Sequence, residues 1–132
     1  MEYHVVDPGE IDATPDYPCG RRSVSDSLDL SALAAAVYEL DPGEQLPRSY
    51  HYHEQREELF YVAAGVLHVE TPTGEFVVEP GELFVATPGS PHRPHSPASA
   101  DETVRVLGVG APKVDVGRPF DPETDVPPSE RS

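Results

Sequence analysis

The sequence predicts an all-β domain, a barrel or a sandwich built from short strands. The chain holds 16 prolines and 10 glycines, which is too many for a helical bundle. Short runs of alternating apolar residues recur along it, and turn-forming triplets such as Asp41-Pro42-Gly43 and Pro72-Thr73-Gly74 separate them. A length of 132 residues fits one domain with a single core.

The first half of the barrel is expected to contain three strands. Residues 30–40 are ambiguous, because their alanines favour a helix by intrinsic propensity. We favour a strand there, since 36–40 runs directly into the turn at Asp41. A second strand is expected around 50–53, and a third over 58–62, which is rich in strand formers.

Four further strands are expected, each bounded by glycine or proline turns, at 66–71, 76–78, 83–86 and 103–109. Side chains alternate between the two faces of a strand. In the first of these strands Leu67 and Val69 therefore share one face, and His68 and Glu70 share the other.

Both ends of the chain are expected to lie outside the barrel of residues 28–111. Residues 1–27 are polar and interrupted by three prolines, which predicts an arm, in which 3–6 could add an edge strand. Residues 112–132 contain five prolines and have the composition of a flexible tail. Phe120 is the apolar residue that could anchor this tail on the body.

The charge balance excludes several partners. The chain has 24 acidic and 9 basic residues, a net charge of −15, and Lys113 is its only lysine. Such a surface repels nucleic acid and anionic membranes, so neither is an expected partner. Abundant acidic residues with so little lysine indicate a halophilic protein, whose self-repulsion is screened by concentrated salt. The alternative is an ordinary acidic protein.

The location and redox state follow from what the sequence contains. No apolar run approaches the length of a membrane span, and the first residues lack a basic region followed by an apolar one. We therefore expect a cytoplasmic protein.

Cys19 is the single cysteine, so no internal disulfide forms. Its Pro/Gly/Arg-rich surroundings predict a surface thiol rather than a catalytic nucleophile.

Four residues form a candidate metal site. His51 and His53 are two apart in an expected strand, so both imidazoles lie on one face. Glu58 follows closely, and His92 comes from a later part of the sheet. Imidazoles and a carboxylate together form a mixed nitrogen and oxygen site for a divalent metal.

The spacing of these residues resembles the two sequence motifs of the cupin superfamily. Thr87 stands where that family usually has proline, and Ser96 where it has asparagine, but neither position is a ligand. The resemblance covers residues 34–109. The matching residues are Gly43, His51, His53, Glu58 and Gly65 in the first motif and Gly81, Gly89 and His92 in the second.

The resemblance implies a jelly-roll β-barrel of six to eight strands with a metal ion near its mouth, as in the small single-domain cupins. It also implies a ligand set of His51, His53, Glu58 and His92. Glu57 competes with Glu58 for the role of the carboxylate. Glu58 keeps the six-residue distance to Gly65, and strand parity then sends Glu58 inward and Glu57 outward.

The other histidines are not expected to bind the metal. His95 is three residues beyond His92, the wrong parity for the same face, and His68 lies opposite the apolar face of its strand. His4 lies in the arm and is expected to be solvated.

Three imidazoles and one carboxylate leave coordination positions open, as catalytic metal sites do. We therefore expect a metal-dependent enzyme of dioxygenase or isomerase type acting on a small molecule, or alternatively a non-catalytic module that binds a small ligand or metal. The site would accept Mn, Fe, Ni or Zn. Exposed strand edges and outward-facing residues predict a homodimer. Residues near the ligands in sequence that could orient an anionic substrate are Arg48, Tyr50, Tyr52, Arg56 and Arg93.

Overall fold

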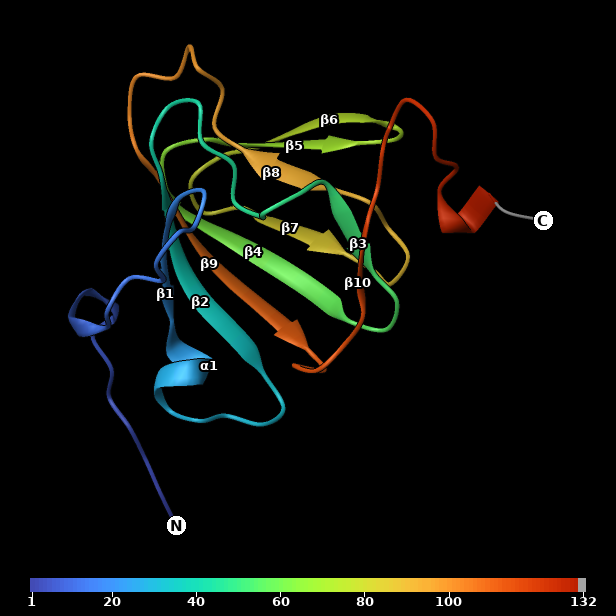
Figure 1. The fold of residues 1–132 in the computed structure, drawn as a ribbon. Helices are drawn as coiled ribbons and strands as arrows, with labels where there is room; N and C mark the ends of the chain where they lie inside the picture. Colours follow the sequence, from blue (N-terminus) through green and yellow to red (C-terminus); the bar gives the residue numbers. More distant parts are fainter. Residues whose placement is uncertain (131–132) are drawn as a thin grey trace.

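The computed structural model describes residues 1–130 and confirms the all-β prediction (Figure 1). Its helices are the four-residue α1 (Val24–Ser27) and the 3-10 turns η1 (Pro8–Glu10) and η2 (Pro128–Glu130). No helix among the described residues is long and apolar enough to cross a membrane. The strands are β1 (Gly20–Ser23), β2 (Ala34–Leu40), β3 (His51–His53), β4 (Glu57–Ala64), β5 (Leu67–Thr71), β6 (Gly74–Val78), β7 (Leu83–Ala86), β8 (Arg93–His95), β9 (Val104–Ala111) and β10 (Gly117–Pro119).

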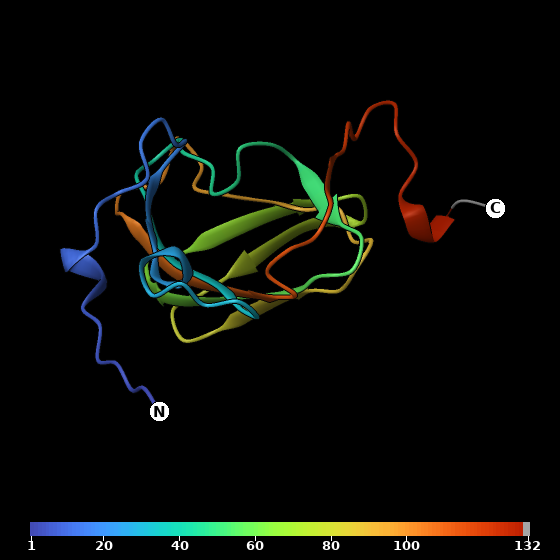
Figure 2. The same ribbon diagram turned by 60° about the horizontal axis from the view of Figure 1, so that its bottom comes forward.

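The strands form three antiparallel sheets that curl around a common interior (Figures 1 and 2). The five-stranded sheet has the order β1-β2-β9-β4-β7, the three-stranded sheet has the order β6-β5-β8, and β10 pairs with β3. Strand β9, late in the sequence, lies between β2 and β4. This arrangement is the jelly-roll barrel that the sequence predicted.

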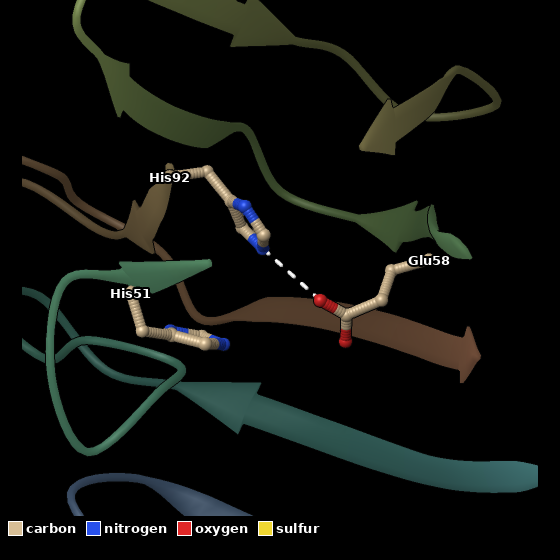
Figure 3. A group of neighbouring side chains, drawn as sticks. All are labelled: His51, Glu58 and His92. Carbon is tan, nitrogen blue, oxygen red and sulfur yellow. Dashed lines mark hydrogen bonds and ion pairs between the residues drawn. The ribbon is translucent and has the colours of Figure 1, made fainter. Parts of the chain in front are cut away.

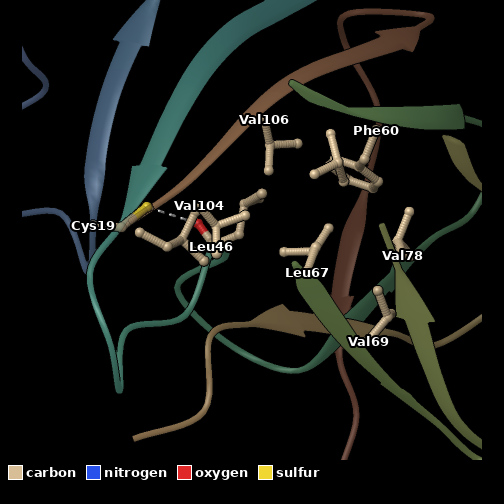
Figure 4. Packing of buried hydrophobic residues seen from close by; sticks show 10 residues of the cluster. Cys19, Leu46, Phe60, Leu67, Val69, Val78, Val104 and Val106 are labelled. Atoms are coloured by element: carbon tan, nitrogen blue, oxygen red, sulfur yellow. Dashed lines mark hydrogen bonds between the residues drawn. The ribbon is translucent and has the colours of Figure 1, made fainter. Parts of the chain in front are cut away.

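One end of the barrel is filled with branched aliphatic side chains. Leu40 on β2, Val62 on β4, Leu67 on β5 and Val106 on β9 are fully buried, and Val104 is 1% exposed. They belong to one apolar cluster, part of which is seen in Figure 4. Burying such a side chain contributes roughly 1.5–3 kcal/mol. We call this cluster the packed end.

The opposite end carries small residues on the same strands. Gly110 on β9 lies opposite Glu58, and Gly108 lies opposite Phe60. A Cβ atom at Gly110 would lie 2.7 Å from Arg56 Cδ, and one at Gly108 would lie 3.0 Å from Tyr38 Cε2. Glycine at these two positions therefore leaves the interior free for larger polar side chains, and we call this region the open end.

The motif glycine Gly65 forms the tight turn between β4 and β5. It has a φ of 73° between β4 and β5, and a Cβ there would lie 2.7 Å from the carbonyl oxygen of Thr103. A left-handed conformation combined with so close a backbone contact requires glycine. Gly81 likewise has a positive φ, of 88°.

The edge strand expected at residues 3–6 is wrong, because the edge of the large sheet is β1, which pairs with β2. Val5 is fully exposed and has no sheet partner, whereas Ser23 at the end of β1 is buried. The Ser23 hydroxyl accepts the Asp26 N–H at 3.1 Å and caps α1. Because β1 contains the Arg-Arg pair, it lacks the apolar alternation that predicts a strand.

The tail folds back along the barrel through β10. Phe120 is 5% exposed, its N–H donates to the Tyr50 carbonyl at 2.8 Å, and its ring centroid lies 5.3 Å from that of Tyr50. Phe120 is thus the apolar anchor that the sequence predicted. The last two residues of the predicted tail, 131 and 132, lie outside the described part of the chain.

The prediction of a surface thiol at Cys19 is wrong. Cys19 is 7% exposed within the apolar cluster, and its Sγ lies 3.8 Å from the Leu46 carbonyl oxygen (Figure 4). Burial, assisted by the nearby Glu44 carboxylate, raises the pKa of the thiol to about 12. Cys19 therefore serves as a small apolar side chain.

Candidate metal centre

Three side chains from separate parts of the chain converge inside the barrel at its open end. They are His51 on β3, Glu58 on β4 and His92 just before β8. One potential ligand atom of each lies within 4.8 Å of the other two. In Figure 3 the two imidazoles and the carboxylate point toward one another. Hydrogen bonds between the His51 and His92 backbones, at 2.9 and 3.3 Å, hold these two histidines side by side.

Strand parity selects the carboxylate. Along β4 Phe60 and Val62 are buried and Glu58 is largely covered, whereas Glu57 and Leu59 are exposed. Glu58 therefore faces the interior and Glu57 faces outward, as the six-residue spacing to Gly65 predicted.

The hydrogen bonds of the His51 and His92 imidazoles leave Nε2 of each ring free to bind a metal. His51 Nδ1 lies 2.9 Å from the Ser49 carbonyl oxygen, and His92 Nδ1 lies 2.7 Å from that of Ser90. A carbonyl oxygen only accepts, so each Nδ1 carries the proton. Each Nε2 then presents a lone pair toward the interior, and a backbone carbonyl fixes the orientation of each ring.

A contact between two acceptors indicates a cation position. His92 Nε2 lies 3.2 Å from Glu58 Oε1, and His53 Nε2 lies 3.5 Å from the same oxygen. With Nδ1 of His92 carrying the proton, a neutral imidazole offers Glu58 only a lone pair. A positive charge between these atoms, a metal ion or a second proton on His92, satisfies this arrangement. The residues therefore fit a divalent metal.

The electrostatics of the site keep its ligands in their metal-binding forms. Burial, followed by the nearby His92, lowers the pKa of His51 to about 4. Burial likewise lowers the pKa of His53. Burial alone would raise the pKa of Glu58, but its contact with His92 and the other neighbouring imidazoles leave it lowered. Around neutral pH the site thus offers neutral imidazole at His51 and His53 and an ionised carboxylate.

His53 borders the group without joining its tightest cluster. Its ring centroid lies 5.0 Å from that of His51, and Arg56 Nη1 lies 3.5 Å from its Nε2. Its buried Nδ1 has no hydrogen bond to the described residues, 1–130, but lies 3.6 Å from Asp115 Oδ2. Asp115 also accepts the N–H groups of Gln55 and Arg56, at 3.0 and 2.9 Å. This carboxylate is placed to orient the His53 ring, as carboxylates behind metal-bound imidazoles do.

The remaining histidines lie elsewhere. His68 and His95 are paired across β5 and β8, on the face opposite the buried Val69. His68 Nδ1 and His95 Nε2 lie 3.1 and 3.4 Å from Glu75 Oε1. His4 is in the N-terminal segment with a side chain 46% exposed.

The converging residues open into a cavity of about 440 Å³. His51, His53 and Glu58 line it, and so do Arg48 and Arg56, two of the residues that the sequence proposed for orienting a substrate. The other three are engaged elsewhere. Arg93 donates to Gln45 and Glu70, Tyr52 is 6% exposed, and Tyr50 packs on Phe120.

The comparisons with known proteins agree with this architecture. Residues 36–110, more than half of the chain, match the family model described as the cupin domain. The chain is a cupin. A comparison with curated protein sequences found no match. The family assignment thus rests on the domain model and on the fold.

Several solved structures have a similar fold. The polyketide cyclase RemF from Streptomyces resistomycificus has a TM-score of 0.74 at 22% identity, over 91% of this chain and 87% of that one. A sugar phosphate isomerase of the cupin superfamily from Silicibacter pomeroyi has a TM-score of 0.70 at 22% identity, over 82% and 75%. KdgF from Halomonas sp. has 0.68 at 20% identity, over 86% and 96%. At these identities the likeness shows the fold.

Sequence reasoning did not identify several residues of this region. Arg21 and Arg118 line the cavity, and Asp115 contacts His53, yet all three lie in segments predicted to be an arm or a tail. Gly108 in the expected strand and Gly110 just beyond it indicate a close approach of other groups, which are Tyr38 and Arg56, but no local pattern marks Arg21, Arg118 or Asp115.

Proposed function

We propose that this cupin is a metal-dependent enzyme acting on a small molecule in the cavity, with His51, His53, Glu58 and His92 as metal ligands. The convergence of His51, Glu58 and His92 within 4.8 Å, with His51 and Glu58 at the wall of an open cavity, carries the proposal. His53 completes the set through its 3.5 Å approach to Glu58. The metal would be Mn, Fe, Ni or Zn, all of which accept imidazole and carboxylate ligands.

The reaction class follows from what the cavity offers. A bound metal would polarise a carbonyl, enol or carboxylate of the substrate as a Lewis acid. Glu58 is the only carboxylate among the described lining residues. The pKa values of Tyr17 and Tyr38 are both raised, mainly by burial. Their hydroxyls therefore stay protonated. These side chains orient a substrate by donating hydrogen bonds, which suits dioxygenase or isomerase chemistry centred on the metal.

The side chains that line the cavity also support a second candidate, a cupin that binds a small ligand or a metal without turnover. Arginine and protonated tyrosine donate hydrogen bonds but do not accept a proton at neutral pH. A cavity with these groups and one carboxylate used as a ligand is suited to holding a molecule. The two candidates share the site and differ only in turnover.

Elemental analysis of protein purified without an affinity tag tests the shared part. We expect about one equivalent of a transition metal per chain in the wild type and in Glu57→Ala, and none in His92→Ala. The metal-loaded protein is then screened for oxygen consumption and for isomerisation of hydroxy and oxo acids. Turnover lost in His92→Ala supports the enzyme, and saturable binding without turnover supports the second candidate. A wild type that holds no metal when each ion is supplied contradicts the enzyme and the metal-binding form of the second candidate.

We also propose a homodimer formed through the outer face of the large sheet. The exposed side chains there follow the register from β9 across β4 to β7, because Leu107 lies opposite Tyr61 and Tyr61 opposite Leu83. Leu83 is 56% and Val85 59% exposed. An apolar face across three strands is typical of an interface. Light scattering in molar KCl should give a dimer, and Val85→Asp should give a monomer of unchanged fold.

A further inference from the structure

The cavity at the metal centre has a charge opposite to that of the molecule. Four of the nine basic residues line it, against one of the 24 acidic residues, although the chain carries a net charge of −15. The acidic surface repels anions at long range, so these arginines do not serve to attract them from solution. Their concentration around one cavity indicates short-range recognition of a negative group.

Two of the four arginines are already neutralised or engaged. Arg118 pairs with Glu54. Arg56 donates to the carbonyl oxygens of Pro112 and Lys113, and its Nη1 lies 4.0 Å from Glu58 Oε2. These contacts hold Arg56 beside the metal centre.

The other two, Arg21 and Arg48, have no carboxylate within ion-pair distance among residues 1–130. Both guanidinium carbons lie over the ring of Tyr17, at 5.4 Å for Arg21 and 4.8 Å for Arg48. Arg21 donates to the Thr14 hydroxyl at 2.9 Å, and Arg48 donates to the Asp16 carbonyl at 2.8 Å. Neutral partners thus fix the position of both side chains, and the acidic residue that acts on Arg21, Asp26, does so from beyond ion-pair distance.

We propose, resting on the function proposed above, that the substrate is a small organic molecule with an oxyanion group, a carboxylate or a phosphate, which Arg21 and Arg48 bind. The cavity of about 440 Å³ holds one such molecule, with its other end at His51 and Glu58. Guanidinium groups form paired, charge-assisted hydrogen bonds with both kinds of oxyanion. Tyr17, stacked with both guanidinium groups, sets the distance between them.

The experiment measures binding of malonate, inorganic phosphate and neutral malonamide to the metal-loaded protein by calorimetry at constant ionic strength. The variants are Arg21→Gln and Arg48→Gln. Arg105→Gln is the matched control, because Arg105 is exposed on β9 and its replacement changes the net charge equally. We expect malonate or phosphate to bind the wild type and Arg105→Gln alike, and each cavity variant about tenfold more weakly or worse. The tighter of the two anions identifies the oxyanion, and malonamide should not bind.

Equal anion binding by the wild type and both cavity variants overturns the proposal, as does the absence of anion binding or equal binding of malonamide. If Arg21→Gln does not fold, Arg48→Gln and Arg48→Lys decide, with the lysine variant expected to lose less affinity. Metal-stripped protein separates this inference from the proposed function. Arginine-dependent binding by a protein that takes up no metal supports the anion site alone. Binding that needs the metal and ignores the arginines supports the metal centre alone.

Discussion

The two ends of the barrel interior use the same strands for opposite purposes. On β9 the inward positions are Val104 and Val106 at the packed end, then Gly108 and Gly110 at the open end. The valines fill the interior completely, with exposures of 1% and 0%, whereas the glycines make room for Tyr38 and Arg56. Hydrophobic burial, the main source of stability, is thus concentrated at one end, and the polar groups that cost stability are gathered at the other.

This separation lets a small domain contain buried polar groups and still be stable. A buried carboxylate beside imidazoles would weaken a core that enclosed it on all sides. Here Glu58 lies two positions from Phe60 and four from the fully buried Val62 on one strand, so a rigid apolar cluster supports the site from one side. We therefore expect changes at one end to leave the other end intact.

Removing a metal ligand should have the largest effect. His51→Ala and His92→Ala should weaken metal retention by more than about 100-fold, since changes behind the ligands alone cost about 10–100-fold. Glu58→Ala should weaken it strongly and Glu57→Ala should not, and metal content after gel filtration measures all four. Loss of metal in Glu57→Ala with retention in Glu58→Ala would show that Glu57, and not Glu58, is the carboxylate ligand.

Truncation at the packed end should lower the stability of the fold and leave metal binding unchanged. Leu67→Ala should lower the free energy of unfolding by about 2–5 kcal/mol, because it opens a cavity in a fully packed region. Leu33→Ala, at a position 43% exposed just before β2 and away from the proposed dimer face, is the control and should cost less than about 1 kcal/mol. Urea titration measures both. Metal content per folded chain should not change, and a folded Leu67→Ala without metal would show that the ends are coupled.

Acid should destabilise the metal-free protein through the open end. His51 has a pKa of about 4 in the folded chain, against about 6.5 when unfolded, so the unfolded chain takes up the proton first. The free energy of unfolding should therefore fall as pH drops from 6.5 toward 4, by about 2 kcal/mol between pH 6.5 and 5. Melts of EDTA-treated protein measure it. His51→Gln should show a shallower slope, and an unchanged slope would exclude His51 as the source.

Salt should produce the smallest effect, and it should act on the outer surface rather than on either end of the interior. Raising KCl from 0.1 to 1 M shortens the Debye length from about 10 to about 3 Å, which removes most of the repulsion within a surface of net charge −15. The melting midpoint should rise by about 4 °C, equivalent to about 1 kcal/mol, with metal content held constant. A midpoint that is flat or falls up to about 2 M would contradict the prediction, made from composition, that the protein is halophilic.

The sequence predicted those features that depend on strand parity and turn chemistry. The alternation along 58–62 placed Glu58 inward, and the glycine at 65 marked the end of its strand, because both follow from local geometry. The features that it missed depend on long-range pairing. Asp115 reaches His53 from a tail, and Arg21 reaches the cavity from a strand without apolar alternation. The depth at which Cys19 lies depends on the Leu46 segment that packs on it, which no local pattern specifies.

Anomalous diffraction from crystals of the wild type, soaked with a single divalent metal, tests the metal centre most directly. The account predicts one ion at full occupancy at the open end, about 2.0–2.2 Å from Nε2 of His51 and His92 and from a carboxylate oxygen of Glu58. His53 should supply a fourth ligand at a similar distance. An ion held instead by His68, His95 and Glu75 on the outer face of the small sheet, with none between His51 and Glu58, would contradict the account.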